Sequence, residues 1–222
     1  MSNVKINDIQ SKLLELAVYF DSFCQKNKIT YYLMGGSALG AVRHGGFIPW
    51  DDDIDVFMTY PNYIKFFEAC ERDLDFDRYY LQKEGTKEWP MFFSKLRMNG
   101  TTFIEEDTKN REMHKGFYID IMCLNNVSTN YIYRYIQYLA ARLITVKTIA
   151  ERGYNTDNNL KKIAMLIFKK LIGNDTLRLL LKLVRSLNYK ETKYVGHFFG
   201  RAKFNKTSFL NEYLGVPRYV NF

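Results

Sequence analysis

The feature that most constrains the fold of this chain is the run Asp51-Asp-Asp-Ile-Asp-Val-Phe-Met58, in which carboxylates and apolar residues alternate. Asp53 and Asp55 are separated by Ile54 and followed by Val56, the spacing of a β-strand with one polar and one buried face. On such a strand the two carboxylates share a face, so their oxygens can converge on one cation. The run therefore predicts a strand with an acidic face.

Helix and strand patterns alternate on both sides of this run. Apolar residues at steps of three and four predict an amphipathic helix over residues 5–26. Ser37 is of a type that commonly caps the start of a helix, and Asn99-Gly100 is a common hairpin turn. We predict further helices over residues 37–43 and 62–72, and strands over residues 30–34, 91–98, 102–105 and 117–123. The pattern indicates an α+β catalytic core to about residue 126, followed by a mostly helical part.

A third carboxylate, Asp120, lies between two isoleucines on one of the predicted strands. A charge buried there costs free energy unless it is paired or bound to a metal ion. Upstream, Gly36 and Ser37 would let backbone N–H groups approach a phosphate at a helix N-terminus. Aspartate runs are usually solvated loops, and Gly-Ser is usually a turn. Together and in this order they favour a phosphoryl-transfer site in which Asp53, Asp55 and Asp120 hold one or two Mg²⁺ (or Mn²⁺) ions.

Four basic side chains are candidate contacts for the phosphates of a donor. Arg43 and His44 lie between the Gly-Ser turn and the aspartates, where Arg suits a bidentate grip on phosphate. A solvent-facing helix end would explain these two residues equally well. Lys95 and Arg97 alternate on a predicted strand and so share a face, which favours them as an anchor for donor phosphates.

Composition limits the class of protein. The chain has 222 residues, 47% of them hydrophobic, which suits one domain with a sizeable core. Its three cysteines are odd in number and show no CxxC spacing, so they argue against a disulfide framework and favour a reducing, cytoplasmic setting. The first residues show no secretion-signal pattern, and no run reaches the roughly 18 apolar residues of a membrane-spanning helix. We therefore predict no integral membrane segment.

The net charge of +8 is spread unevenly. Residues 131–195 hold 13 Lys and Arg against 4 Asp and Glu, a local excess of +9, which leaves the rest of the chain close to neutral. Residues 160–172 and 177–187 combine an apolar stripe with basic side chains, which suits the anionic inner face of a membrane and, equally, a solvated cover on a core. Basic charge also attracts RNA, but no RNA-binding signature is present, so we predict no nucleic-acid partner. We divide the chain into a catalytic core, residues 1–126, and a basic helical region, residues 127–222, that completes the same domain.

The segment Gly36-Ser-Ala-Leu-Gly-Ala-Val-Arg-His-Gly-Gly-Phe-Ile-Pro-Trp-Asp-Asp-Asp-Ile-Asp-Val56 closely resembles the signature of the LicD family of phosphocholine transferases. That family is itself similar to the fukutin-type phosphotransferases. Further matches lie at Lys95-Leu96-Arg97 followed by Thr101, at residues 115–121 and, more weakly, at residues 194–200. The resemblance spans most of the chain in order, and its first motif is long enough to be highly specific.

This resemblance implies a nucleotidyltransferase-like fold, with a mixed sheet flanked by helices. It also implies the metal-dependent transfer of phosphocholine, or a related phospho-alcohol, from a CDP-activated donor such as CDP-choline. The acceptor would be a hydroxyl of a surface glycan precursor destined for lipopolysaccharide, teichoic acid or capsule. If the basic helices bind the inner face of the membrane, they would place the enzyme beside a lipid-linked acceptor. A choline donor would need aromatic rings around its quaternary ammonium. The chain is rich in aromatic residues throughout, so we interpret four nearby rings as core rather than as a choline box: Trp50, Trp89, Phe92 and Phe93.

The same resemblance assigns roles to residues at matching positions. Asp53 and Asp55 would be metal ligands, and Asp120 would be a third ligand or a base. Gly36 and Ser37 would contact the donor phosphate. The aspartates at positions 51 and 52 belong to the signature without an assigned chemical role.

Two other functions stay open at this level. A nucleotidyltransferase would instead move a nucleoside monophosphate to a small molecule or protein, and the part of the donor left on the product distinguishes the two reactions. A non-catalytic basic protein would bind membrane or nucleic acid, and the complete set of three aspartates argues against it. Members of the family continue past the position that matches Val216-Pro217, so the resemblance predicts a further segment beyond Phe222.

Overall fold

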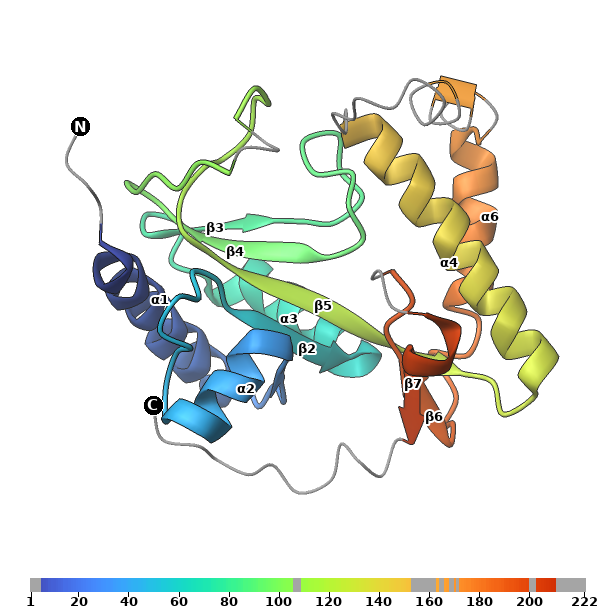
Figure 1. The fold of residues 1–222 in the computed structure, drawn as a ribbon, viewed down its shortest axis with the longest axis horizontal. Coiled ribbons are helices and arrows are strands. Elements are labelled where there is room, and N and C mark those ends of the chain that lie inside the picture. The colour runs from blue at the N-terminus through green and yellow to red at the C-terminus, as the bar shows by residue number, and fades with distance from the viewer. Residues whose placement is uncertain are drawn as a thin grey trace. The chain divides into compact units, whose positions relative to one another are not determined.

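The computed structural model describes residues 5–105, 109–152, 163, 166–167, 170, 172–199 and 203–210. These residues belong to two compact units (Figure 1). Of the described residues, the first unit contains those up to Glu84 and those within Phe93–Cys123, and the second contains Gly85–Phe92 and those from Leu124 onward. Helices and a mixed sheet form the described part of the chain, which confirms the predicted α+β class. The division at residue 126 within one domain stays a prediction.

The first unit is built on a sheet with the strand order β1-β2-β5-β4-β3. Its strands are β1 (Tyr32–Leu33), β2 (Asp55–Thr59), β3 (Tyr79–Gln82), β4 (Ser94–Met98) and the first part of β5 (Tyr118–Val127). Its helices are α1 (Ile6–Lys26), α2 (Gly35–His44) and α3 (Tyr60–Asp73). The sequence predicts all of these elements except β3, which is only 4 residues long.

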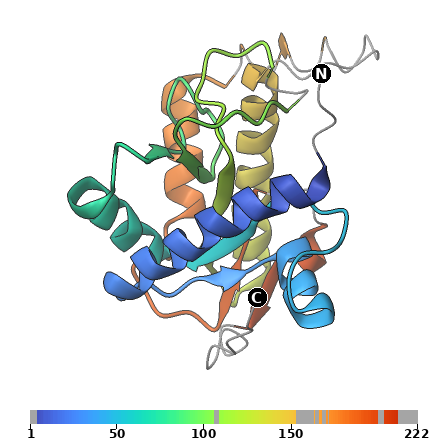
Figure 2. The ribbon, with the colours of Figure 1, turned by 90° about the vertical axis from the view of Figure 1, so that its left-hand side faces the viewer.

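The core of this unit lies between the sheet and the helices α1 and α3. Leu16 and Phe20 of α1 are buried, as are Val56 and Met58 of β2. Phe20 contacts Phe66 of α3 with a distance of 5.7 Å between ring centroids. Figure 2 shows α1 lying across β1 and β2. Burial of these apolar side chains fixes which face of β2 points inward and therefore which face carries the aspartates.

The structure corrects the predicted start of α2. The helix begins at Gly35, with Met34 in an extended conformation as its N-cap, so the prediction that Ser37 caps the helix is wrong. The Met34 N–H donates to the carbonyl of Asp55 at 2.9 Å, which ties the residue before the helix to β2. The chain therefore passes from β1 into α2 without a loop in which Ser37 could act as a cap.

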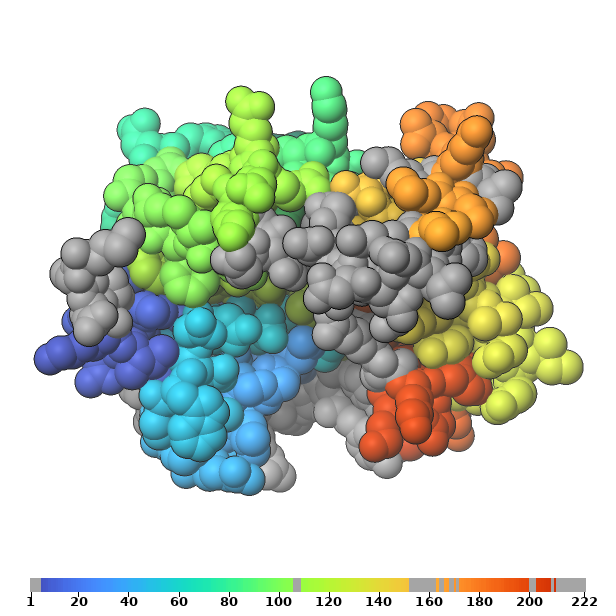
Figure 3. Space-filling view, turned by 45° about the horizontal axis from the view of Figure 1, so that its top comes forward, coloured from blue at the N-terminus to red at the C-terminus, as the bar shows by residue number. Residues whose placement is uncertain are grey.

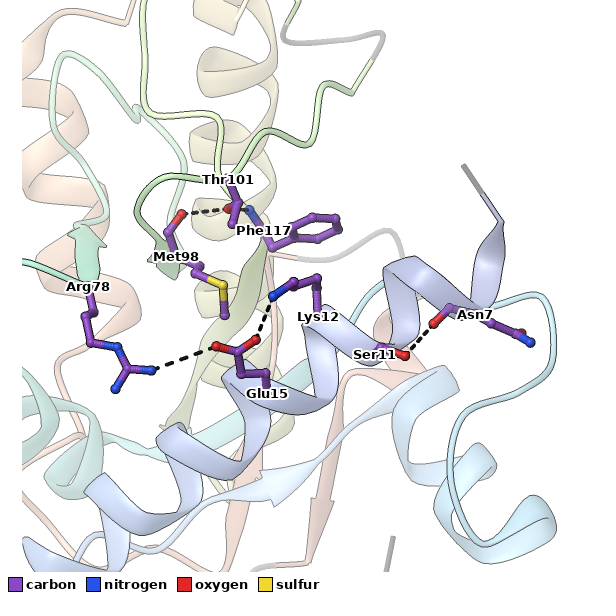
Figure 4. Close-up of polar contacts among 8 residues, drawn as sticks. All are labelled: Asn7, Ser11, Lys12, Glu15, Arg78, Met98, Thr101 and Phe117. Atoms are coloured by element: carbon purple, nitrogen blue, oxygen red, sulfur yellow. Dashed lines mark hydrogen bonds and ion pairs between the residues drawn. The ribbon is translucent and has the colours of Figure 1, made fainter. Parts of the chain in front are cut away.

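The predicted hairpin at Asn99-Gly100 is also wrong. β4 pairs with β3 and β5, and residues 102–105 form no strand. Gly100 does adopt a turn conformation, with φ at 70°. The Thr101 hydroxyl then donates to the Met98 carbonyl at 2.8 Å and accepts the Phe117 N–H at 3.1 Å (Figure 4). The turn signal is real, but the chain after it is held against the ends of β4 and β5 instead of pairing as a strand.

The second unit is mainly helical. Its elements are the end of β5, α4 (Tyr131–Arg152), α6 (Asn174–Val184), β6 (Tyr194–Gly196), the 3₁₀ helix η1 (Phe204–Lys206) and β7 (Ser208–Leu210). β6 pairs antiparallel with the end of β5 and with β7. A separate core forms around Ala141, Ile144, Val184 and Phe198. The helix predicted over residues 160–172, with Lys161, Lys162 and Lys169, falls largely outside the described residues, as does the chain after Leu210.

The structure bears on the predictions about the cysteines and about membrane-spanning segments. Cys24, Cys70 and Cys123 are buried thiols, and no disulfide is present among the described residues. Within the same ranges, no helix has both the length and the apolar character needed to cross a bilayer.

Candidate active site

The acidic run places its carboxylates as the alternation predicts. Ile54 and Val56 are buried, whereas Asp53 and Asp55 are only partly covered. The regular strand begins at Asp55, so Asp53 lies just before it, but the alternation of sides continues through both residues. The Asp55 N–H donates to the hydroxyl of Ser37 at 2.9 Å. This bond joins α2 to β2 and fixes the backbone from which the Asp55 carboxylate extends.

Asp120 reaches the same region from the neighbouring strand. Its N–H donates to the carbonyl of Ile54 at 2.9 Å, so β5 runs beside the acidic segment. Burial, followed by repulsion from Asp120 and Asp53, raises the pKa of Asp55 to about 7. Burial, followed by repulsion from Asp51 and Asp120, raises the pKa of Asp53 to about 6. The three carboxylates are thus close enough to destabilise one another's charge, and they attract a cation.

Asp120 already has one cationic neighbour, Lys95. The two residues are register partners across β4 and β5, and the Lys95 ammonium lies 2.8 Å from the Asp120 carboxylate oxygen Oδ1. Burial lowers the pKa of Lys95 and raises the pKa of Asp120, while their mutual attraction opposes both changes.

Arg97 lies on the same face of β4 as Lys95 but is used by the protein itself. Its guanidinium donates to the side-chain oxygen of Gln82 and to the carbonyl of Gly116, each at 2.8 Å. Both Lys95 and Arg97 lie over the ring of Tyr118, at 3.2 and 4.8 Å from its centroid. The shared face predicted from the alternation is present, but both side chains are buried. Contact of either with a donor phosphate stays a prediction.

The loop that carries the aspartates back to the sheet is closely packed against α2. A Cβ atom on Gly40 would lie 2.5 Å from the carbonyl oxygen of Gly46 and 2.9 Å from the amide nitrogen of Ile48. The side-chain amide of Gln10, from α1, donates to the carbonyls of Ile48 and Asp51 at 3.0 and 2.9 Å. The segment between the Gly-Ser pair and the aspartates is therefore held in place by its contacts with α1 and α2.

The remaining candidate site residues lie at opposite ends of α2. Gly36 and Ser37 lie in its first turn, and a Cβ atom on Gly36 would approach the Asp51 carboxylate to 2.6 Å. The N-terminus of this helix thus faces the acidic loop, where backbone N–H groups favour an anion. Arg43 and His44 lie in the last turn and are exposed. They stand about 10 Å farther along the helix axis, given a rise of about 1.5 Å per residue.

The carboxylates suit a divalent cation in their chemistry. Mg²⁺ takes oxygen ligands and is often held by one or two carboxylates together with substrate phosphates. Among the described residues, no group of three or more His, Cys, Asp or Glu side chains converges closely enough to hold a metal ion. Asp53 and Asp55 lie on one side of the β2 segment and therefore fit as a pair of ligands for such an ion. Phosphate oxygens of a donor would fill the remaining coordination positions of the ion. The ion pair with Lys95 sets Asp120 apart from these two aspartates.

Sequence reasoning missed three residues that shape this region, namely Glu105, Tyr118 and Gln82. Glu105 lies 4.0 Å from the Lys95 ammonium, and Tyr118 and Gln82 support Lys95 and Arg97. Tyr118 precedes Asp120 by two residues and so shares its face of β5, a signal that the strand alternation already contained. Glu105 lies in the loop after β4, at the end of the segment wrongly predicted to be a strand, and the sequence of that segment does not indicate a contact with Lys95.

Comparison with known proteins connects this site to a family. Residues 28–132 match the LicD/FKTN/FKRP nucleotidyltransferase domain. The lipopolysaccharide cholinephosphotransferase LicD of Haemophilus influenzae is 44% identical over 69 residues, which make up 31% of this chain and 26% of that protein. The ribitol 5-phosphate transferases FKRP of Homo sapiens and Mus musculus are each 48% identical over 44 residues, 20% of this chain and 9% of theirs. These alignments cover about a quarter or less of each relative's length.

The matched segment includes every carboxylate of the site, from Asp51 to Asp120. It also includes α2, the loop that returns to β2, and the strands β4 and β5 that bring Lys95 and Asp120 together. Residues 28–132 of this chain are therefore similar to the nucleotidyltransferase domain of the LicD/FKTN/FKRP family.

Proposed function

We propose that this protein transfers phosphocholine or a related phospho-alcohol from a CDP-activated donor to a hydroxyl of a glycan precursor. The observation that carries the proposal is the cluster of Asp53, Asp55 and Asp120 on neighbouring segments of a LicD/FKTN/FKRP nucleotidyltransferase domain. Two relatives that share this domain are named as transferases of phosphocholine and of ribitol 5-phosphate. Both names describe a phospho-alcohol as the group that moves.

In the proposed reaction, the acceptor hydroxyl oxygen forms a bond to the phosphorus of the phospho-alcohol, and the bond from that phosphorus to CMP breaks. Asp53 and Asp55 would hold Mg²⁺ or Mn²⁺, which neutralises charge on the donor phosphates when bound. Backbone N–H groups at the start of α2, beside Gly36, would orient a donor phosphate. The proton of the acceptor hydroxyl passes to a carboxylate of the cluster, and CMP leaves.

The decisive test is the mass of the product. The protein is incubated with Mg²⁺, a glycan extract from its own cells and one donor at a time: CDP-choline, CDP-ribitol or CDP-glycerol. A glycan that gains a phospho-alcohol supports the proposal. A glycan, small molecule or protein that gains a nucleoside monophosphate supports the nucleotidyltransferase alternative. If no donor is consumed with or without Mg²⁺, the proposal is wrong and a non-catalytic binding role gains support.

Trp50 gives a way to test whether choline is the alcohol. Its side chain is 77% exposed, so the interpretation of Trp50 as a core residue is wrong, whereas Trp89 and Phe92 are buried. Trp50 also immediately precedes Asp51. A cation–π contact contributes about 0.5–2 kcal/mol. With CDP-choline, Trp50→Ala is therefore expected to raise KM by about 2- to 30-fold with little change in kcat. With CDP-ribitol, which has no cationic group, KM should stay the same. An equal rise for both donors would show that Trp50 does not recognise the ammonium.

We also propose that the second unit binds the anionic inner face of a membrane. Ile132, Ile136, Leu139 and Leu143 form a stripe along α4 at helical spacing, and these four residues are between 38% and 70% exposed. The atoms of α4 reach the surface in Figure 3, where they are yellow. The stripe lies within residues 131–195, which carry the +9 excess of charge. An exposed apolar stripe in a basic segment of the chain fits the interface of an anionic bilayer.

A vesicle assay tests this location. Ile136→Glu places a carboxylate in the stripe and is expected to lower binding to phosphatidylglycerol vesicles by at least tenfold, about 1.4 kcal/mol, because it loses apolar contact and gains repulsion. The matched control is Val18→Glu, at a position on α1 that is 60% exposed. The control should bind like the wild type. Equal binding by both variants, or no binding by the wild type at low salt, would contradict the membrane proposal.

A further inference from the structure

The side chain of Lys95 is an ammonium enclosed within the protein. It is 2% exposed, and its nitrogen lies 2.8 Å from the Asp120 carboxylate, 4.0 Å from the Glu105 carboxylate and 3.2 Å from the centre of the Tyr118 ring. A buried charge of this kind is retained only when its partners compensate for the water that it has lost. The carboxylates and the ring provide that compensation, so these contacts are enough to explain why the Lys95 ammonium is buried.

The charges around Lys95 do not cancel. Asp53 and Asp55 flank Ile54, whose carbonyl accepts the Asp120 N–H at 2.9 Å, and Glu105 adds a further acidic group 4.0 Å from the Lys95 ammonium. Arg97 is the other buried cation on this strand, and it donates to Gln82 and to the Gly116 carbonyl. Lys95 therefore faces two carboxylates, those of Asp120 and Glu105, with one positive charge, so this part of the cluster keeps an excess of negative charge that can attract a further cation.

We propose that Lys95 is an internal counter-ion that holds Asp120 in the metal-free protein and competes with a divalent cation for the charge of the cluster. In this proposal Lys95 is a positioning residue that sets how tightly the site binds a cation. It acts on the donor only through Asp120. The inference rests on the proposed use of a divalent cation, but it is independent of which group is transferred and of the acceptor.

The position of Lys95 in the sheet supports this role over direct contact with a donor phosphate. Because Lys95 and Asp120 are directly opposite each other in the antiparallel register, their contact is fixed by the backbone pairing of β4 and β5. The ring of Tyr118 covers the ammonium, and that of Phe93 lies 5.5 Å away. An ammonium enclosed in this way acts on a ligand through the carboxylate that it touches.

The test measures Mn²⁺ binding and thermal stability in purified full-length protein, without any donor. Lys95→Met keeps most of the length of the side chain and removes its charge. We expect Lys95→Met to bind Mn²⁺ about tenfold more tightly than the wild type, because a positive charge beside the cation site is gone. Without metal its melting temperature should fall below that of the wild type, and Mn²⁺ should raise it by more than it raises the wild type. Lys95→Arg, which keeps the charge, should show the Mn²⁺ affinity of the wild type.

A second variant separates charge from packing. If Lys95→Met is unstable because Asp120 has lost its counter-ion, the double variant Lys95→Met/Asp120→Asn should recover stability in the absence of metal. If the double variant is no more stable than Lys95→Met, packing explains the loss and the proposal fails. Mn²⁺ affinity in Lys95→Met that is equal to or weaker than that of the wild type also overturns it, as does an absence of Mn²⁺ binding by both proteins. Failure to transfer a phospho-alcohol would overturn only the proposed function, since no donor enters this test.

Discussion

Replacing Asp55 with Asn is expected to slow phospho-alcohol transfer by about a thousandfold, or ~4 kcal/mol, without destabilising the fold. The amide has nearly the shape of the carboxylate but gives a metal ion a much weaker ligand. Burial and two neighbouring carboxylates disfavour the charge of Asp55 and therefore raise its pKa to about 7. At pH 8 the native protein holds this unfavourable charge, so the uncharged Asn should leave the melting temperature unchanged or raise it.

The matched control for this experiment is Asp52→Asn. Asp52 belongs to the same acidic run but is exposed, so the same chemical change there removes no buried charge. Its transfer rate should stay within about twofold of the wild type, because isolated surface substitutions typically change energies by about 0.5 kcal/mol or less. Transfer rate is measured with the donor that the product assay identifies, and stability by thermal unfolding. Near-normal turnover by Asp55→Asn, or an equal loss in both variants, would remove Asp55 from the proposed metal site.

Replacing Gly40 with Ala is expected to destabilise the protein by about 2–4 kcal/mol and to reduce activity with it. Within a helix this exchange normally stabilises by about 1 kcal/mol, because Ala is the better helix former. Here the added methyl group would meet the backbone of Gly46 and Ile48 at 2.5 and 2.9 Å, and backbone atoms cannot rotate away as a side chain can. The loop would have to move, and the position of Asp51 would move with it.

Gly46→Ala is the control for Gly40→Ala. Nothing lies within 4 Å of the Cβ atom that Gly46 would gain, and its φ is not in the left-handed region. Unfolding by urea should therefore give Gly46→Ala a stability close to that of the wild type. The packing argument is wrong if the Gly40 variant is as stable as the wild type. It is also wrong if both variants lose the same free energy.

The parts of the fold that follow from local pattern could be predicted from the sequence. The amphipathic spacing of α1 and the alternation through Asp53 and Asp55 each report the local period of the backbone together with burial on one side. The acidic face of β2 was predictable for this reason, and so was the presence of Asp120 on another strand. These features need no knowledge of which strands are neighbours.

The errors arise where a residue's partner lies far along the chain. The Asn99-Gly100 pair does form a turn, but the strand that pairs with β4 is set by packing of the whole sheet. The contact between Lys95 and Asp120 depends on the register of β4 and β5, which neither segment determines alone. A lysine that alternates with an arginine on a strand has the same appearance in sequence whether it meets a ligand or a buried carboxylate. Glu105 was missed because it approaches Lys95 from a segment that was wrongly predicted to be a strand.

The hydrogen bond from the Asp55 N–H to Ser37 has a consequence for how the sequence can change during evolution. An N–H that loses its acceptor in a partly buried place costs about 1–3 kcal/mol, so position 37 should drift among side chains that still accept a hydrogen bond. Thr, Asn or Asp would serve, and Ala or Val would not. Residues found at position 37 in natural relatives should then be ones whose side chains can accept a hydrogen bond. This should hold even in relatives that use a different phospho-alcohol donor. A Gly-Ser pair that persists in such chains would then be retained as much for the hydrogen bond that joins α2 to β2 as for the binding of a substrate.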